Sequence, residues 1–519
     1  MLFPTMTFAI FFVVVLGVSW RLSDRPLQWK LFVLAASYVF YGWWDARFCL
    51  LLAGSTIANH LIVQLVARAR TDRSARIAML AGVVVNLVVL GFFKYYGFFV
   101  DSLLQALEPM GLAPTALLIK VGLPVGISFF TFCAISYVVD VFREEQEPIA
   151  LLDFAVYLSF FPHLVAGPIV RVSEFEPQLR RRRNRDTVDA VRAARLICRG
   201  MFKKVVIANY LATAIVDPVF ASPGQSPNLE LAVAAIAYAV QIYADFSGYT
   251  DMAIGIALLM GIRFPDNFDQ PYSATSIQDF WRRWHMTLSR WLRDYVYIPL
   301  GGNRGGERAE MRNLVATMAI GGLWHGANWT FIVWGFYHGF GLVLERKWKE
   351  RPARSWRRGA LDLRDPDADP EHAAADGYPD RPPMSAAPPR SGADGDTQVM
   401  ARPAPPRKEP NVWVSRLVVF AFVTVGWIFF RAVDLPTAVN YLTGLVTRWG
   451  VGDLVTPLVL LTIVAGMVGQ FVPRRLGDAL EYRASHLPPA ALGLGVGLFL
   501  VVTNLLGPVG VAPFIYFAF

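Results

Sequence analysis

The sequence has little charge. Asp, Glu, Lys and Arg make up only 17% of its 519 residues, and 55% are hydrophobic; ordinary soluble domains have roughly 25% charged residues. Charge is wholly absent from residues 3–20, 121–139, 454–472 and 487–519. Each of these runs is at least about as long as a helix that crosses ~30 Å of hydrocarbon. The composition therefore excludes a secreted or cytosolic enzyme, and continuous rather than alternating hydrophobicity argues against a β-barrel porin.

Cysteine is also scarce. Cys49, Cys133 and Cys198 lie in apolar or amphipathic stretches and form no CxxC pair, so neither a disulfide framework nor a zinc site is indicated. We predict no metal and no bound cofactor. The net charge of +9 is attributed to cytoplasmic loops, which collect Lys and Arg in proteins with several spans. Nucleic acid is therefore not an expected partner, whereas the lipid bilayer is.

The hydrophobic pattern predicts an all-α polytopic membrane protein with about 11–13 transmembrane or re-entrant helices. Basic residues cluster at 68–76, at 180–204 and from 346 onward, which assigns these segments to the cytoplasmic side. The predicted spans are 3–20, 31–44, 48–66, 77–100, 121–141, 154–170, 200–216, 231–260, 313–345, 413–430, 454–472 and 487–505.

One segment is predicted to lie outside the membrane. Residues 346–410 hold 12 of the 34 prolines and 24 charged residues, 13 basic and 11 acidic. This composition cannot bury a core, so we expect a disordered cytoplasmic loop. The predicted organisation is a membrane core at 1–345, the loop at 346–410, and C-terminal helices at 411–519 that complete the core.

His325 lies in an unusual apolar segment. Residues 313–344 contain no Asp, Glu, Lys or Arg, and one straight helix of this length would measure about 50 Å, well over a bilayer. Cations flank both ends, so we expect a segment that enters and returns, or a long helix broken at its glycines. Either geometry places His325 near mid-membrane, where an ionisable side chain is a functional candidate. On a continuous helix Asn328, Trp329 and Ile332 would share its face.

A second candidate region is residues 279–295. Aromatic residues and His285 recur there at helical spacing, offset from several arginines, which predicts an amphipathic interfacial helix. A membrane-surface anchor explains this pattern. However, anchoring does not need a histidine, and the nearby Arg282 and Arg283 suit a phosphate-bearing ligand. The residues alone leave these two interpretations equally open.

Asp245 and Asp251 form a third candidate region within an apolar span. Six residues apart, they lie on different faces of a helix, which argues against a paired-carboxylate hydrolase. The favoured interpretation is that they hold basic partners or fix the backbone, and a proton relay is the alternative. His338 follows His325 by thirteen residues, points elsewhere on a continuous helix, and is interpreted as structural.

Several long motifs occur in a characteristic order. They are PVGISFFTF from Pro124, FPHLVAGPI from Phe161, YADFSGYTDMAIG from Tyr243, DFWRRWHMTLSRWLRDYVYIPLGGNR from Asp279, GGLWHGANWTFIVWGFYHG from Gly321 and GWIFFRA from Gly426. In this order they resemble the membrane-bound O-acyltransferase superfamily, and within it the bacterial alginate O-acetyltransferase branch. The resemblance covers most of residues 1–345 and 411–435. The segment 346–410 departs from the compact pattern but interrupts no motif.

The resemblance implies a fold and a site. It implies a ring of tilted helices around a thin central region, where a cytoplasmic funnel and an extracellular opening meet. It also implies that His325 occupies the catalytic histidine position and that His285 occupies the second functional histidine position. Asn328 is a candidate oxyanion donor. The other candidate substrate-binding or donor-binding residues are Trp324, Arg282, Arg283 and Asp245.

The resulting hypothesis is acetyl transfer across the inner membrane of a bacterium. A cytoplasmic thioester, acetyl-CoA, would donate its acetyl group to a hydroxyl on the far side, with His325 as general base or as a covalent acetyl carrier. The chain has no GxSxG motif and no soluble acyltransferase domain, so an extracytoplasmic partner protein is expected. The acceptor would be an alginate-like exopolysaccharide, a wall polymer or a serine of the partner.

Two alternatives remain. A proton-coupled transporter would use Asp245, Asp251, His325 and His338 as a path and should show inverted repeats, which the sequence does not display. A lipid acyltransferase of the same superfamily would take a long acyl chain instead of acetyl.

Overall fold

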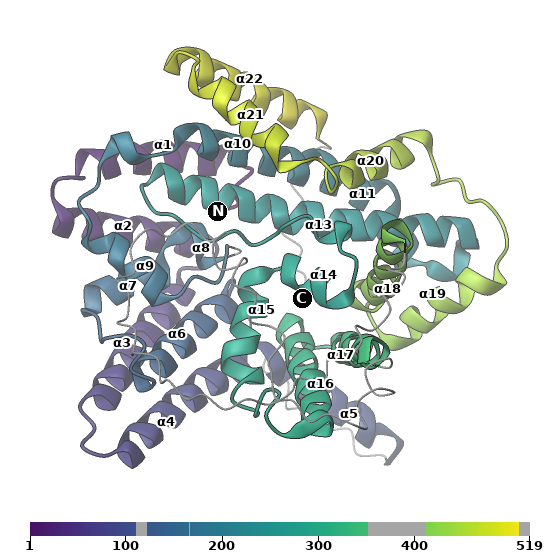
Figure 1. Cartoon of the computed structure of the whole chain (residues 1–519), viewed down its shortest axis with the longest axis horizontal. Helices are drawn as coiled ribbons and strands as arrows, with labels where there is room; N and C mark the ends of the chain where they lie inside the picture. The colour runs from purple at the N-terminus through teal and green to yellow at the C-terminus, as the bar shows by residue number, and fades with distance from the viewer. Residues whose placement is uncertain (111–121, 166, 351–410, 508–519) are drawn as a thin grey trace, which may run out of the picture.

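A computed structural model describes residues 1–110, 122–165, 167–350 and 411–507. Across these ranges the chain forms α-helices with short 3-10 and π-helical segments and no β-strand (Figure 1), so the predicted all-α class is confirmed. Six helical segments are long and apolar enough to cross a membrane. They are Arg47–Ala67, Asp72–Met110, Ala190–Ala221, Asn228–Leu259, Val412–Arg431 and Pro489–Leu506.

The N-terminal helices carry apolar side chains on the outside of the molecule. Leu50 is 78% exposed and Val88 is 63% exposed. Exposed apolar surface of this extent is expected where lipid surrounds a protein. These helices are α1 (Met6–Arg21), α2 (Pro26–Gly42), α3 (Arg47–Ala67), α4 (Asp72–Leu90) and α5 (Tyr96–Leu107), with a π-helical segment, Gly91–Tyr95, between the last two.

The predicted span 154–170 is interrupted. Helix α7 (Leu151–Ser159) ends before Phe160, and the short helix α8 (Phe161–Leu164) follows. Phe160 adopts φ −54° and ψ 108°, outside the helical region, two residues before Pro162. Helix α6 (Ile127–Phe142) precedes this pair, and α9 (Val172–Arg180) follows it. The expectation of one continuous span here was wrong, because hydrophobicity alone does not reveal a break in the backbone.

Helix α13 (Asn228–Leu259) forms the centre of the molecule and crosses the middle of Figure 1. It packs closely against α10 (Ala190–Met201), where a side chain at Gly200 would meet the carbonyl oxygen of Gly248 at 2.5 Å. Small residues at such crossings let two backbones approach. The π-helical segment Phe202–Ala208 continues from α10 along α13. This arrangement brings the cations of α10 and the π-helical segment against the carboxylates of α13.

Residues 306–350 fold back on themselves as a helical hairpin. Helix α16 (Gly306–His325) ends at the histidine, and α17 (Trp329–Glu350) returns after a short extended connection. A side chain at Gly322 would meet the carbonyl oxygen of Phe331 at 2.3 Å, so glycine permits the close crossing. The segment therefore folds back, which agrees with the predicted geometry that enters and returns. The continuous helix that would have placed Asn328 and Trp329 beside His325 does not form.

Glycine 335 gives a test of this hairpin. Its Cβ would lie 2.5 Å from the backbone oxygen of Met318, whereas a Cβ at Gly54 of α3 meets nothing within 4 Å. Because a backbone atom cannot move aside as a flexible side chain can, Gly335→Ala should cost about 1–3 kcal/mol. The thermal midpoint of the purified protein in detergent should fall for Gly335→Ala and should not fall for Gly54→Ala. Equal midpoints would contradict the tight crossing.

The region 279–295 is not one helix. Helix α14 (Ile277–Arg283) ends before Trp284, and α15 (Met286–Leu292) begins after His285, followed by a π-helical segment at Arg293–Tyr297. His285 has φ +42°, a left-handed conformation that breaks the helix. The predicted continuous amphipathic helix was wrong for this reason. The break still buries Trp284 and His285 in the interior.

The C-terminal helices pack against the core. They are α18 (Val412–Arg431), α19 (Leu435–Thr447), α20 (Pro457–Val468), α21 (Arg474–Ser485) and α22 (Pro489–Leu506). Helix α18 packs against α17 and α13. Helix α17 runs through Glu350, so the predicted loop boundary at residue 346 falls inside a helix. The remainder of that predicted loop, residues 351–410, lies outside the described residues, as do the last twelve residues of the predicted C-terminal segment.

Candidate active site

His325 lies among aromatic rings at the end of α16. Its residue is 3% exposed. Its ring centroid lies 4.8 Å from that of Trp324, 5.0 Å from that of Trp334 and 5.1 Å from that of Phe430. The rings come from α16, α17 and α18, so the hairpin and the C-terminal helix together cover much of the imidazole. Such apolar surroundings strengthen electrostatic interactions with a bound substrate.

Lys94 fixes the backbone at this position. Its Nζ donates to the carbonyl oxygen of Trp324, to that of His325 at 3.2 Å, and to the hydroxyl oxygen of Ser128 at 3.2 Å. The last carbonyls of a helix have no intrahelical partner, and a cation there also complements the helix dipole. Lys94 thus anchors the end of α16. Sequence reasoning missed it, although a lone cation inside the predicted span 77–100 was an available signal.

A cavity adjoins the imidazole. Its volume is ≈ 80 Å³, enough for several water molecules or a small acyl group. Lys94, Ser128, Trp324 and His325 contribute to its wall. The other lining residues are Trp44, Leu123, Pro124, Val125, Gly126, Ile127, Phe129 and Val165. The first motif of the sequence, from Pro124, therefore forms one side of the space next to His325.

The structure brings both predicted histidines close to Trp324. The ring centroid of Trp324 lies 5.9 Å from that of His285 and 4.8 Å from that of His325. His285 is 0% exposed, and its ring packs edge-on against Phe246 at 4.7 Å. His285 is therefore not part of an interfacial anchor, because its side chain points into the protein interior. Trp324, a candidate binding residue, therefore packs near both imidazoles.

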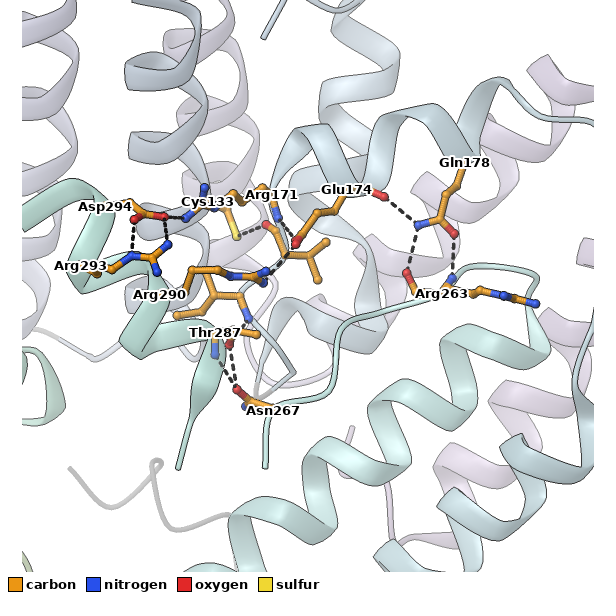
Figure 2. A network of polar contacts seen from close by, with 12 residues as sticks. Cys133, Arg171, Glu174, Gln178, Arg263, Asn267, Thr287, Arg290, Arg293 and Asp294 are labelled. Carbon is orange, nitrogen blue, oxygen red and sulfur yellow. Dashed lines mark hydrogen bonds and ion pairs between the residues drawn. The ribbon is translucent and has the colours of Figure 1, made fainter. Parts of the chain in front are cut away.

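A polar network holds the loop that carries His285 (Figure 2). The side-chain oxygen of Asn267 accepts from the backbone N–H of Thr287 at 3.2 Å and from its hydroxyl at 2.8 Å. The Thr287 hydroxyl in turn accepts from the backbone N–H of Ile169 at 3.0 Å. Nearby, Arg290 pairs with Glu174 at 3.0 Å. These bonds join α15 to α9 and to the segment before it.

The two candidate arginines differ in their surroundings. Arg283 donates to Asp279 at 2.7 Å and lies 4.0 Å from Asp269, so its charge is used within the protein. Arg282 is exposed on α14, and within the described ranges it forms no hydrogen bond or ion pair. Of the pair, Arg282 is the one whose guanidinium is not held by a carboxylate, so it could meet a phosphate-bearing ligand.

The carboxylates of α13 have basic partners, as the favoured interpretation predicted. Asp245 forms an ion pair with Lys204, and the two side chains are 4% and 2% exposed. Asp251 is 2.7 Å from Arg199 and 2.8 Å from Lys203. All three cations belong to α10 and the π-helical segment that follows it. These contacts account for both acidic residues through helix packing.

Asn328 and His338 lie in different settings. The amide nitrogen of Asn328 donates to the carbonyl oxygen of Val433 at 2.7 Å, and its oxygen accepts from the backbone N–H of Thr330 at 3.0 Å. Both polar atoms of Asn328 are thus used in joining α17 to the end of α18. His338 is 0% exposed and packs against Trp334 and Trp281, with ring centroids 4.9 Å and 5.2 Å away.

Comparison with known proteins matches residues 122–361 to the model of the membrane-bound O-acyltransferase family. A probable alginate O-acetylase of Pseudomonas aeruginosa is 47% identical over 67% of this chain, which spans 66% of that relative. The corresponding protein of Azotobacter vinelandii is 37% identical, with 95% of this chain and 90% of the relative covered. A peptidoglycan O-acetyltransferase of Helicobacter pylori is 34% identical over 83% of this chain and 76% of its own length.

These matches agree with the motifs and with the helical architecture. The family model spans both histidine-bearing motifs and the hairpin that carries His325. The bacterial relatives and the apolar helices together identify a multi-pass bacterial membrane protein. The chain belongs to the membrane-bound O-acyltransferase family, in its alginate O-acetyltransferase-like branch.

Proposed function

We propose that this O-acyltransferase passes an acetyl group from cytoplasmic acetyl-CoA across the membrane for O-acetylation of an extracytoplasmic polysaccharide, with a partner protein on the far side. The observation that carries the proposal is the position of His325, buried in aromatic rings beside a cavity at the tip of a helical hairpin. The names of the relatives, alginate O-acetylase and peptidoglycan O-acetyltransferase, support a polysaccharide acceptor. An alginate-like exopolysaccharide or a wall polymer fits equally.

The chemistry requires little of the protein because a thioester is already activated. The acceptor hydroxyl attacks the thioester carbonyl, a C–O bond forms and the C–S bond breaks. In our proposal the imidazole of His325 takes the hydroxyl proton and returns it to the thiolate sulfur of the leaving CoA, so that no net proton is consumed. General base catalysis of this kind contributes typically about 10²–10⁴-fold. Lys94 holds the backbone at His325 and thereby keeps the base in place.

The size of the cavity bears on the acyl group. A space of ≈ 80 Å³ beside His325 suits an acetyl group, and the donor-binding test below separates acetyl from the long chain of the lipid acyltransferase alternative. The ion pairs of Asp245 and Asp251 count against the transporter alternative, because both carboxylates are held by cations of neighbouring helices.

Donor binding tests the proposal directly. Purified protein should bind labelled acetyl-CoA, and unlabelled acetyl-CoA should displace the label at lower concentration than palmitoyl-CoA does. Preference for palmitoyl-CoA would instead identify a lipid acyltransferase. Binding of neither thioester, together with thioester-independent flux in proteoliposomes, would identify a transporter.

A further inference from the structure

The backbone at His285 is strained and must be held. Its φ of +42° places a non-glycine residue in the left-handed region, at a cost of about 1–3 kcal/mol. Asn267 supplies bonds on the C-terminal side of this residue. Its carbonyl oxygen accepts from the N–H of Met286 at 2.9 Å, and its side-chain oxygen accepts from the N–H of Thr287 at 3.2 Å. Asn267 itself is 1% exposed, so these bonds are shielded from water.

The amide orientation of Asn267 follows from these bonds. Oxygen and nitrogen of an asparagine amide have similar shapes and are assigned from their partners. The backbone N–H of Thr287 can only donate, so the atom it faces must be the oxygen. The hydroxyl of Thr287, which accepts from Ile169, directs its own proton to the same oxygen at 2.8 Å. Two independent donors therefore fix the amide.

The amide orientation determines the tautomer of His285. The same oxygen of Asn267 lies 3.1 Å from Nδ1 of His285. An amide oxygen only accepts, so Nδ1 must carry the proton. In a neutral imidazole the other nitrogen, Nε2, then presents a lone pair. Residue spacing alone could not show this, because Asn267 lies eighteen positions before His285 in a loop.

The lone pair of Nε2 is buried and faces the interior. His285 is 0% exposed, and Nε2 has no hydrogen-bond partner in the described part of the chain. Leaving a buried acceptor unsatisfied costs about 1–3 kcal/mol. A group that donates a hydrogen bond would remove this cost, whereas a carbonyl oxygen, which only accepts, could not bind here. The site at Nε2 therefore selects an O–H or N–H group.

We propose that Asn267 is a positioning residue that fixes His285 in the Nδ1-protonated tautomer, so that Nε2 binds an O–H or N–H group of a substrate. This inference rests on the proposed function for the identity of the substrates. Two sources carry such a group: the hydroxyl of the acceptor and the amides of the acyl-CoA arm. In this tautomer Nε2 of His285 cannot donate a hydrogen bond to the thioester carbonyl. Other groups of the site must therefore bind that carbonyl.

The tautomer can be measured without any substrate. Full-length protein with ¹⁵N-labelled histidine rings is placed in lipid bilayers, and the His285 signals are assigned by difference from His285→Gln in solid-state NMR. Wild type should show a protonated Nδ1 and an unprotonated Nε2, and Asn267→Leu should show a mixture of both tautomers. A protonated Nε2 in wild type, or an unchanged spectrum in Asn267→Leu, would overturn the proposal whether or not the chain transfers acetyl.

Kinetics separate positioning from mere structural support. Loss of a partner that orients an imidazole typically costs about 10–100-fold in activity, so Asn267→Leu should lower acetyl transfer by this factor.

Asn267→Asp keeps an acceptor toward Nδ1 and favours the protonated ring, so the acid limb of the pH–rate profile should move to higher pH. A raised KM for acetyl-CoA would assign Nε2 to the donor arm, and a raised KM for the acceptor would assign it to the hydroxyl.

Thr287→Val is the matched control. It removes a hydroxyl from the same oxygen of Asn267 but leaves the contact with Nδ1, so the tautomer and the position of the acid limb should match wild type. If Thr287→Val shifted the pH profile as Asn267→Asp does, or if neither variant shifted it, Asn267 would be a packing residue only. In that case acetyl transfer by His325 would still stand, because its own test uses a different residue.

Discussion

Replacing His325 with alanine or glutamine should abolish acetyl transfer while the protein remains folded in the membrane. The imidazole is the ionisable group beside the cavity that our mechanism uses as base, and its loss removes a contribution of about 10²–10⁴-fold. Glutamine keeps much of the volume among the rings of Trp324, Trp334 and Phe430. The measurement is transfer of labelled acetyl from acetyl-CoA by membranes that contain equal amounts of each variant.

His60→Gln is the control for this experiment. His60 lies on α3 and is half-buried, away from the residues that line the cavity, so this variant should keep wild-type transfer. Substantial activity in both His325 variants would reject the catalytic role of His325. Loss of His325→Gln from the membrane fraction would show instead that the ring supports the fold.

Replacing Asp245 with alanine should destabilise the protein by about 3–5 kcal/mol. The reason is that the Lys204 ammonium, 2% exposed, would remain buried without its carboxylate. Thermal unfolding in detergent measures the effect. Asp24→Ala breaks a pair between Asp24 and Arg182 whose side chains are 70% and 83% exposed, and it should change stability by only about 0–1 kcal/mol.

A double replacement separates packing from donor binding. Asp245→Leu combined with Lys204→Met removes both charges, and replacing a buried pair by apolar residues is often neutral or stabilising. If Asp245 serves packing alone, the double variant should recover both stability and acetyl transfer. A stable double variant with a raised KM for acetyl-CoA would assign Asp245 to the donor site, as the sequence alone had allowed.

Sequence patterns predicted the features that appear as long apolar runs or as local motifs. Long apolar runs predicted most of the helices, and the charge-free segment around His325 made this residue a candidate before any comparison. The same patterns predicted one helix through His285 and one span through Phe160, and both are broken. Hydrophobicity records which residues avoid water. It does not record where φ and ψ leave the helical region, because bonds from distant residues stabilise such breaks.

The residues that support the site were also hidden from sequence patterns, because they act through contacts with distant parts of the chain. Lys94 reaches the end of α16 across about 230 positions of sequence, and Asn267 meets His285 only because a loop returns beside it. Neither lies at a spacing that a helix or strand would reveal. Lys94 could have been suspected as a lone cation in an apolar span, whereas Asn267 carried no signal at all.

The sequence by itself determined that this protein is helical, embedded in a membrane and built around two histidine-bearing motifs, because apolar length and motif content are local properties of the chain. Only the tertiary structure decided that residues 306–350 form a hairpin, that Trp324 packs near both imidazoles, and which cations pair with the acidic residues of α13. Those outcomes depend on pairs of atoms from distant segments, whose contacts are set by the packing of the whole molecule.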